Sequence, residues 1–306
     1  MSLRIPESNG PSRREFLKAA GAVTAAVASG SVYGAADTAD SEPSSRSVKG
    51  PALVDTNVYL SQWPGRRLPL DETPKLIAKL RREGVTEAWA GSFDALLQKD
   101  LAAVNARLAE ECQRQGRALL RPFGSVNPML PDWEEDLRRC HEIHKMPGIR
   151  LHPNYHGYQL TDPAFAKLLD LATARGLLVQ LAATMEDERT QHRLMHAPPV
   201  DLAPLAEQLK SRPALRLLLL NWPRGTNPIA TKSLAGAGQV CFDIATVEGV
   251  GGVQNLLAQL PANRVVFGSY TPFYYFDSAA LKLKESSLSE ADMLGVRSTS
   301  ALRLLS

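Results

Sequence analysis

The chain has 306 residues, of which 44% are hydrophobic and 22% charged, and its formal net charge is +3. These values are those of a folded globular protein, so they exclude a disordered polyelectrolyte and a collagen-like repeat. The small net charge gives no basis for a nucleic-acid partner. Three scattered cysteines are too few for a disulfide framework or a thiolate zinc site.

The first 36 residues have the pattern of an export signal. A twin-arginine motif at 12–18 is followed by a weakly apolar run at 19–32 and by small residues at 34–36 that suit signal peptidase. We therefore expect residues 1–36 to be a bacterial twin-arginine signal peptide that directs the protein to the periplasm or the outside. The alternative is a disordered, alanine-rich tail. The Ser-rich segment 37–50 is expected to be a flexible linker.

From residue 51 to residue 306, short apolar runs alternate with segments of helical spacing. Beyond the signal, no apolar run approaches the roughly 20 residues of a membrane span. The predicted strands are 52–57, 85–91, 118–126, 148–153, 177–182, 215–221, 239–245 and 264–269. The predicted helices are 71–83, 96–115, 162–176, 202–211, 250–260 and 289–305. Asp162 is expected to cap its helix and Pro163 to begin it. The segment after Asn221 gives only a weak helix signal, because glycines and a proline interrupt it.

Eight strand–helix units in about 256 residues predict one domain, 51–306, with the fold of a closed (β/α)₈ barrel. The strand at 215–221 is apolar almost throughout, as strands covered on both faces are. The alternative, an open doubly wound sheet, would place a glycine-rich phosphate-binding turn after the first strand, and residues 55–59 contain no glycine. In a barrel of this kind, the chemistry takes place at the carboxyl ends of the strands.

Three segments, 54–60, 148–153 and 267–272, make the chain resemble the amidohydrolase-related family of metal-dependent barrel hydrolases. That family opens with Asp-x-His-x-His and adds a histidine after strand five, another after strand six and an aspartate after strand eight. These groups bind one or two divalent metals that activate water. The five ligand positions align here with Asn57, Tyr59, Ala182, Asn221 and Tyr270.

Amides and phenols are poor ligands for a divalent metal, and alanine is none. We therefore predict no metal and no other cofactor. The alternative is a divalent metal such as zinc in a rebuilt site, formed by His152 or His156 with acidic and histidine side chains of the segment 186–196.

The strand ends supply the candidate site residues. Arg150 and His152 flank Leu151, so both side chains should point to the same side of the sheet. If they point inward, Arg150 would anchor a carboxylate, His152 would act as general acid or base, and Tyr270 would stabilise an anion. The alternative is a structural ion pair of Arg150 with Asp55 or Asp243. The predicted substrate-binding residues are Asp55, Asn57, Tyr59, Asn127, His156, Tyr158, Asn221, Trp222 and Asp243. The barrel-mouth amides and phenols among them would either bind a ligand or fill the vacated cavity and satisfy one another.

Two aromatic segments are expected near the mouth. Residues 154–158 are predicted to be a loop that closes over a ligand, or one that simply packs on the barrel. Residues 270–276 hold five aromatic side chains, which favours a lid, a homo-oligomer contact or a buried loop.

The leading functional hypothesis is a hydrolase of a small-molecule ester, lactone or amide that works without the family's metal. Decarboxylation is a related option. The alternatives are a non-catalytic ligand-binding barrel, that is a pseudoenzyme, and an exported assembly partner.

Overall fold

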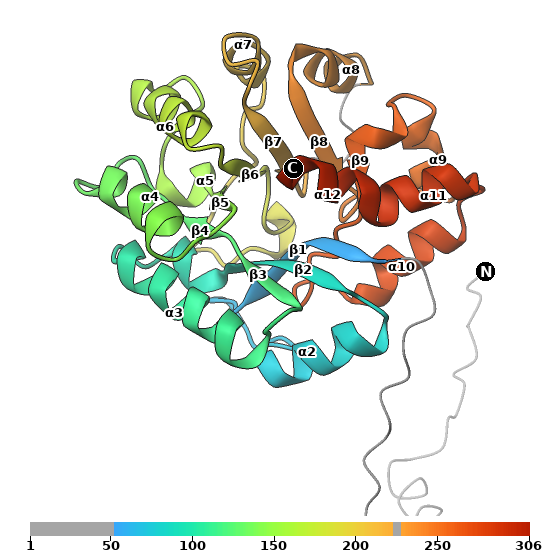
Figure 1. Ribbon diagram of the computed structural model, residues 1–306, viewed down its shortest axis with the longest axis horizontal. Coiled ribbons are helices and arrows are strands. Elements are labelled where there is room, and N and C mark those ends of the chain that lie inside the picture. The colour runs from blue at the N-terminus through green and yellow to red at the C-terminus, as the bar shows by residue number, and fades with distance from the viewer. Residues whose placement is uncertain (1–51, 223–227) are drawn as a thin grey trace, which may run out of the picture. The chain divides into compact units, whose positions relative to one another are not determined.

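The strands form a ring, and the helices surround it (Figure 1). The computed structural model describes residues 52–222 and 228–306, all within one compact unit, Val48–Ser306. The predicted signal and linker, residues 1–50, lie outside the described residues. The described part contains the strands β1 (Val54–Leu60), β2 (Glu87–Ser92), β3 (Leu120–Pro122), β4 (Gly124–Ser125), β5 (Gly148–Leu151), β6 (Leu178–Ala182), β7 (Arg216–Leu220), β8 (Gln239–Asp243) and β9 (Val265–Val266).

All strand pairs are parallel, in the orders β1-β2-β3 and β4-β5-β6-β7-β8-β9. β3 and β4 are two parts of the single strand predicted at 118–126, and Phe123 between them donates its backbone N–H to Ala90 O at 2.8 Å. The first and last strands meet through Thr56 N to Phe267 O, 3.0 Å, and Tyr59 N to Thr271 O, 3.0 Å. The predicted closed barrel is thereby confirmed.

The outer layer consists of the helices α2 (Thr73–Arg82), α3 (Leu101–Gln115), α4 (Trp133–Glu142), α5 (Pro153–His156), α6 (Pro163–Ala174), α7 (Leu205–Lys210), α8 (Pro228–Ala237), α9 (Gly252–Leu257), α10 (Phe276–Lys284), α11 (Glu290–Leu294) and α12 (Ser300–Leu305). The single-turn 3₁₀ helices are η1 (Phe93–Leu96), η2 (Glu188–Thr190) and η3 (Ala262–Arg264), and a π-helical turn, η4 (Gly295–Thr299), joins α11 to α12. Among the described residues, no helix is both long and apolar enough to cross a membrane.

Several helices differ from the prediction. The segment 154–158 is not a loop, because α5 occupies most of it. α10 was not predicted, and α8 forms despite the weak signal. Asp162 precedes α6 without capping it, because its Oδ2 accepts from the N–H of Gln159 at 2.7 Å, before the helix begins.

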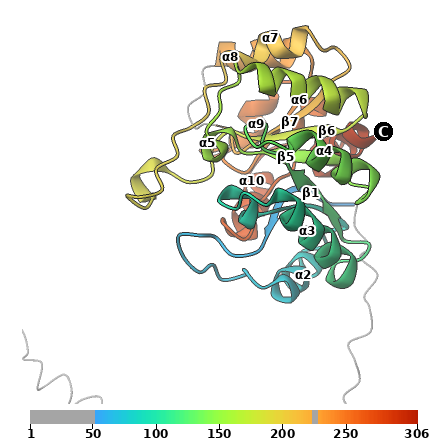
Figure 2. The ribbon, with the colours of Figure 1, turned by 90° about the vertical axis from the view of Figure 1, so that its left-hand side faces the viewer.

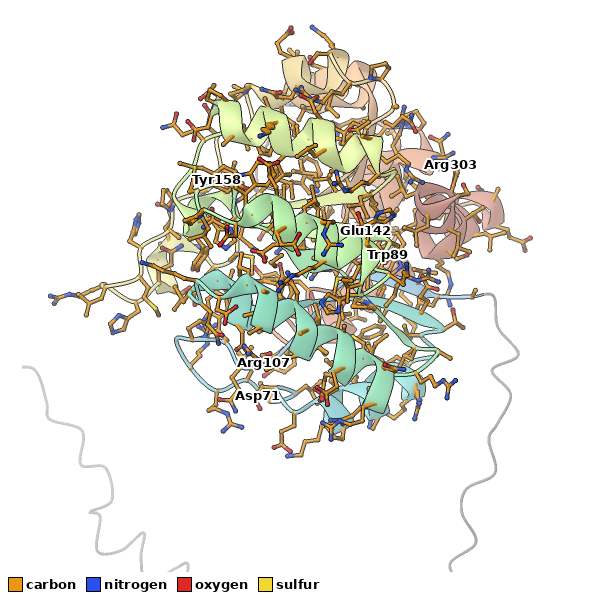
Figure 3. All side chains as sticks on the ribbon, turned by 60° about the vertical axis from the view of Figure 1, so that its left-hand side comes forward. Asp71, Trp89, Arg107, Glu142, Tyr158 and Arg303 are labelled. Atoms are coloured by element: carbon orange, nitrogen blue, oxygen red, sulfur yellow. The ribbon has the colours of Figure 1, made fainter. Side chains whose placement is uncertain are left out.

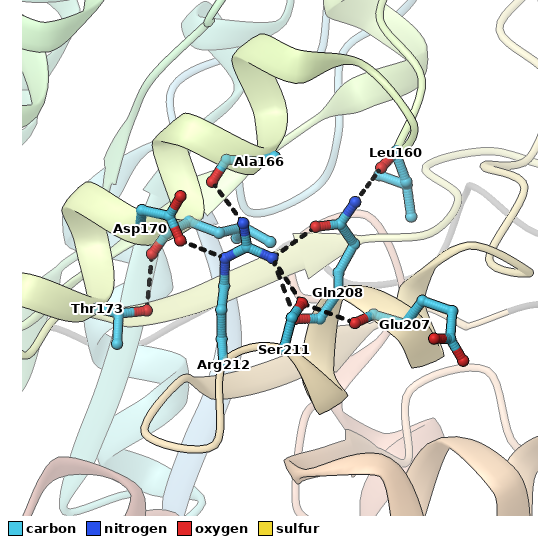
Figure 4. Close-up of polar contacts among 9 residues, drawn as sticks. Leu160, Ala166, Asp170, Thr173, Glu207, Gln208, Ser211 and Arg212 are labelled. Atoms are coloured by element: carbon cyan, nitrogen blue, oxygen red, sulfur yellow. Dashed lines mark hydrogen bonds and ion pairs between the residues drawn. The ribbon is translucent and has the colours of Figure 1, made fainter.

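Neighbouring outer helices are also held by polar contacts. Arg212, just after α7, donates to Asp170 Oδ1 at 2.6 Å and to Ala166 O at 3.2 Å, both on α6 (Figure 4). It also donates to Gln208 Oε1 at 2.7 Å. One long side chain therefore ties α6 to α7 outside the barrel.

The barrel interior has apolar groups at both ends. At the amino ends of the strands, side chains such as Val54, Trp89 and Phe123 pack together and are covered by Ala301 and Leu304 of α12. At the carboxyl ends lies a mouth cluster, which we define as Tyr59, Trp63, Leu68, Phe93, Leu96, Ala182, Met185, Ala245 and Tyr270. Buried polar side chains from the strands occur between these two apolar groups, and they form the candidate site.

Candidate functional site

Arg150 lies at the centre of the barrel with no exposed surface. Its Nε donates to Gln180 Oε1 at 2.7 Å, Nη1 donates to Val58 O at 2.7 Å, and Nη2 donates to Trp89 O at 2.9 Å. The guanidinium carbon is 4.4 Å from the centre of the Tyr59 ring, a cation–π contact. The Arg150 guanidinium therefore uses its N–H groups within the barrel wall. The prediction that it anchors a substrate carboxylate is wrong.

Among the described residues, Arg150 also makes no ion pair, so the alternative with Asp55 or Asp243 is wrong as well. Gly91 explains how the guanidinium fits, because a Cβ at that position would lie 2.8 Å from Nη1. The charge is balanced at longer range: Asp243 and Asp55 both favour its charged form, although burial lowers the pKa of Arg150. Arg150 thus acts as a structural cation that satisfies backbone carbonyls.

Asn57, Asn221 and Asp243 form a connected cluster, which we call the amide–carboxyl cluster. Asn57 Nδ2 donates to Asn221 Oδ1 at 2.8 Å and to Asp243 Oδ2 at 2.6 Å, and the Asn221 backbone N–H donates to Asp243 Oδ1 at 3.1 Å. Gly268 makes room for it, since a Cβ there would lie 2.9 Å from Asp243 Oδ2. Asn57 Oδ1 and Asn221 Nδ2 are buried and have no hydrogen-bond partner among the residues that the structure describes. The cluster is therefore compact but not fully satisfied.

Two carboxyl groups are buried here, Asp243 within the cluster and Asp55 beside it. Burial raises the pKa of Asp243 to about 7, despite the hydrogen bonds from Asn57 and Asn221 that lower it. Burial likewise raises the pKa of Asp55 to about 6, against hydrogen bonds from Ser269 and from the Asn57 backbone. Both groups can therefore exchange protons close to neutral pH.

The tyrosines of the mouth cluster lie above these polar groups. Tyr59 stacks on Phe93 with ring centres 4.5 Å apart, and its ring meets that of Tyr270 edge-on at 5.6 Å. Tyr270 Oη donates to the backbone oxygen of Met185 at 2.7 Å. Burial raises the pKa of Tyr59 to about 12 and that of Tyr270 well above 10, so both phenols are neutral. Because the Tyr270 hydroxyl proton is donated to Met185 O, it is not available to stabilise an anion as the sequence predicted.

His152 is buried beside the mouth cluster, and its Nε2 is 3.0 Å from Tyr59 Oη. His156 Nε2 donates to Ala95 O at 2.8 Å, and the two imidazole centres are 5.7 Å apart. Burial holds the pKa of His152 well below 6.5, and the neighbouring His156 and Arg150 lower it further. The Nδ1 atoms of both histidines lack a hydrogen-bond partner among the described residues. His152 is therefore a neutral, enclosed imidazole at neutral pH.

The remaining predicted residues are spread around the mouth. Asn127 Oδ1 accepts from Met129 N in a turn, 3.0 Å, and Trp222 Nε1 donates to Asp243 O at 3.0 Å. Tyr158 is buried beside the first turn of α6, where its ring centre is 5.8 Å from that of Phe165 (Figure 3). Asn127 and Tyr158 thus support neighbouring backbone and core rather than the amide–carboxyl cluster.

The aromatic segment 270–276 is largely a buried loop. Tyr270 and Phe276 are each 1% exposed, whereas Tyr275 is 70% exposed. Phe273 and Tyr274 are half-buried against the mouth cluster. Little aromatic surface is left for the predicted lid or subunit contact, and oligomerisation stays a prediction.

A cavity of about 360 Å³ opens beside the mouth cluster, under the loop that follows β6. This loop projects away from the barrel (yellow in Figure 2). Of the predicted site residues, Asn221 and Tyr270 line the cavity. The sequence prediction missed the other lining residues, which are Thr184, Met185, Glu186, Asp187, Glu188, Arg189, Pro199, Thr246 and Tyr274. The charged segment 186–196 after the fifth predicted strand was their signal in the sequence, but it was interpreted as part of a possible metal site.

The donor atoms at the expected metal-ligand positions do not suit a divalent metal. Asn57 turns its NH₂ group, not a lone pair, toward Asn221 and Asp243. The Tyr270 hydroxyl donates to a backbone carbonyl, and Ala182 has no ligand atom. Within the described ranges, no three His, Cys, Asp or Glu side chains gather as a possible metal site. A bound metal needs several converging lone pairs, so these residues do not fit one.

Comparison with known proteins bears on fold and export. Residues 60–218 match the sequence profile of the family described as Amidohydrolase. Residues 10–30 match the profile of the TAT (twin-arginine translocation) pathway signal sequence, which confirms the predicted signal. No curated protein matches the chain in sequence.

Several solved structures share the fold. A 2,6-dihydroxybenzoate decarboxylase from Rhizobium has a TM-score of 0.63 at 14% identity, and the match covers 84% of this chain and 98% of that one. A dihydroxybenzoic acid decarboxylase from Polaromonas sp. JS666, determined with bound manganese and the inhibitor 2-nitroresorcinol, has a TM-score of 0.63 at 13% identity, with 84% and 97% covered. A 5-carboxyvanillate decarboxylase from Sphingomonas paucimobilis has a TM-score of 0.64 at 12% identity, with 84% and 99% covered. At these identities the likeness concerns the fold alone.

Proposed function

Because the chain belongs to the amidohydrolase family, we propose that it is an exported, small-molecule-binding barrel that does not use the family's metal chemistry. Its ligand would occupy the cavity beside the mouth cluster. The twin-arginine match supports export, and we propose a periplasmic or extracellular location. The proposed organisation is a signal peptide at 1–36, a linker at 37–50 and the barrel at 51–306.

The observation that carries this proposal is the amide–carboxyl cluster. Asn57 Nδ2 donates to both Asn221 Oδ1 and Asp243 Oδ2, so the amide protons occupy the place where converging lone pairs would be needed. Asn221 also lines the cavity. A cavity with an apolar wall and a few polar groups is the usual form of a small-molecule site. The geometry thus supports binding more directly than it supports turnover.

The catalytic alternative is hydrolysis of an ester, lactone or amide, or decarboxylation of an aromatic acid. The sequence prediction that His152, Arg150 and Tyr270 are the catalytic residues has little support, because none of the three has both a free functional group and exposed surface. Two observations favour some form of catalysis: the fold neighbours are named as decarboxylases, and burial brings the pKa of Asp243 to about 7. A general acid or base works best near such a value.

Binding and turnover assays on the purified protein separate these proposals. We expect compounds from a library of small aromatic and hydroxylated metabolites to raise the Tm, and calorimetry to give a one-to-one stoichiometry. We expect no product from esters, lactones, amides or hydroxybenzoates, with or without added zinc or manganese. Turnover that depends on Asp243, or that appears on addition of a metal, would overturn the proposal.

A pair of adjacent prolines offers a matched control for the location of the ligand. Pro199 lines the cavity and is exposed, whereas its exposed neighbour Pro198 does not line it. Pro199→Trp should therefore fill the cavity and abolish the ligand-induced rise in Tm, and Pro198→Trp should preserve it. Equal binding by both variants would place the ligand elsewhere.

A further inference from the structure

The loop between β1 and α2 contributes two side chains, Trp63 and Leu68, to the mouth cluster. We propose that residues 62–71 of this loop are a lid that opens and closes the barrel mouth, and that Arg66 is the latch that holds the lid closed. Such a lid would control access to the enclosed Tyr59 and His152, which goes beyond the proposed binding function.

The lid is anchored in the mouth cluster by its two buried side chains. Trp63 and Leu68 are buried, whereas the four residues between them are exposed. The Trp63 indole meets the rings of Phe93 and Phe273 edge-on, with centres 5.2 and 4.7 Å apart. Phe93 in turn stacks on Tyr59, which has no exposed surface. The indole therefore covers the aromatic groups of the mouth.

Arg66 ties the lid to two other loops. Its Nη1 pairs with Glu186 Oε1 in the loop after β6, and its guanidinium carbon is 5.0 Å from the centre of the Phe273 ring in the loop after β9. The lid (blue) and the loop after β6 (yellow) lie on the same side of the barrel in Figure 2. Among the described residues, no other side chain of 62–71 forms a hydrogen bond or ion pair outside the lid.

The lid is also braced within itself, so it can move as one body. Arg67 donates to both carboxylate oxygens of Asp71, at 2.5 and 3.0 Å, and the Leu68 backbone N–H donates to the same carboxylate at 3.2 Å. Just before the lid, Ser61 has a φ of 67°, in the left-handed region that residues other than glycine rarely adopt. Hinges are loop residues that absorb such backbone changes, so we place the hinge at Ser61.

One buried group disfavours the closed lid. The Trp63 Nε1–H is buried and has no hydrogen-bond partner in the part of the chain that the structure describes. A buried donor without an acceptor is unfavourable because it has lost its bond to water, and opening the lid would return it to water. The ion pair of Arg66 with Glu186 opposes this penalty. Loss of that ion pair should therefore shift the lid towards its open state while the barrel stays folded.

Chemical labelling of His152 in the purified protein measures the opening of the lid. Diethyl pyrocarbonate modifies accessible neutral imidazoles, and peptide mass spectrometry separates His152 from His141 on the outer helix α4, which serves as the internal standard. We expect Arg66→Gln to raise the labelling rate of His152 about tenfold, because a charge-assisted pair with one buried partner is lost. Arg66→Lys should retain most of the protection.

Arg67→Gln is the matched control. Arg67 pairs with a carboxylate as buried as Glu186, that of Asp71, but this pair lies inside the lid. The variant should leave the labelling rate of His152 close to that of the wild type. The three buried cysteines report on unfolding of the barrel, and they should resist iodoacetamide in every variant.

Equal labelling of His152 in the wild type and in Arg66→Gln, or an equal rise in Arg67→Gln, would refute the role of Arg66 as latch. A rise that is accompanied by cysteine labelling would mean unfolding instead of lid opening, and would refute it as well. None of these measurements involves a ligand, so the proposed binding function stands or falls separately.

Discussion

Replacing Asp243 by asparagine should change how the stability of the protein depends on pH. Burial raises the pKa of this carboxyl group from 3.8 to about 7. The folded state therefore holds the proton more tightly than the unfolded state between these two values, and stability falls as the pH rises through this window. The whole effect corresponds to about 4 kcal/mol, of which about 3 kcal/mol falls between about pH 5 and about pH 9.

Asp243→Asn removes this titration. The new amide at position 243 also requires the side-chain amides of Asn57 and Asn221 to rotate by half a turn, so that Asn57 Oδ1 becomes an acceptor. This arrangement leaves a buried donor without a partner, which costs about 1–3 kcal/mol at any pH.

Urea unfolding of wild type and variant at a series of pH values is the assay. The free energy of unfolding of the variant minus that of the wild type should increase by about 3 kcal/mol from about pH 5 to about pH 9. An exposed control, Asp201→Asn, should follow the wild type. If the curves for Asp243→Asn and wild type run parallel over this range, the argument from burial is refuted.

Three further changes test the barrel interior. Arg150→Met should cost about 3 kcal/mol of unfolding free energy in urea, because the carbonyls of Val58 and Trp89 lose their donors. Asn57→Leu should cost about 2 kcal/mol in the same assay, and an unchanged midpoint would contradict the role of the amide–carboxyl cluster. Burial lowers the pKa of His156 below 6.5, so its contribution is present above pH 6.5 and is lost as the pH falls below it. His156→Gln should therefore lessen the fall in Tm on acidification.

The fold could be predicted from the sequence because the strand pattern and the helix pattern agreed with the same barrel. Apolar runs such as that in β7 are buried on both sides of the barrel wall, and the intervening helices bury the predicted faces, such as Phe165 and Leu168 of α6. The convergence of Asn57 and Asn221 at the mouth also followed, because the carboxyl ends of parallel strands meet at one edge.

The details of the site did not follow, for physical reasons. Alternation along β5 predicts that Arg150 and His152 share a side, and both are buried near Tyr59. Alternation does not predict how far below the barrel mouth a side chain lies. That position decides whether the Arg150 guanidinium contacts backbone carbonyls or a ligand. The cavity depends on the course of an irregular loop, 183–200, which has no periodicity that a sequence pattern could report.

The contact between β1 and the end of β9 also determines when the barrel can close in the cell. The hydrogen bond from Thr56 Oγ1 to Phe267 O spans 211 residues. A ribosome therefore synthesises the first strand long before its partner exists, and until then that strand has an unprotected edge. Export machinery that threads an extended chain through a pore would separate the two strands at this stage. The twin-arginine route accepts finished proteins, so the ring can close in the compartment of synthesis before the protein is moved.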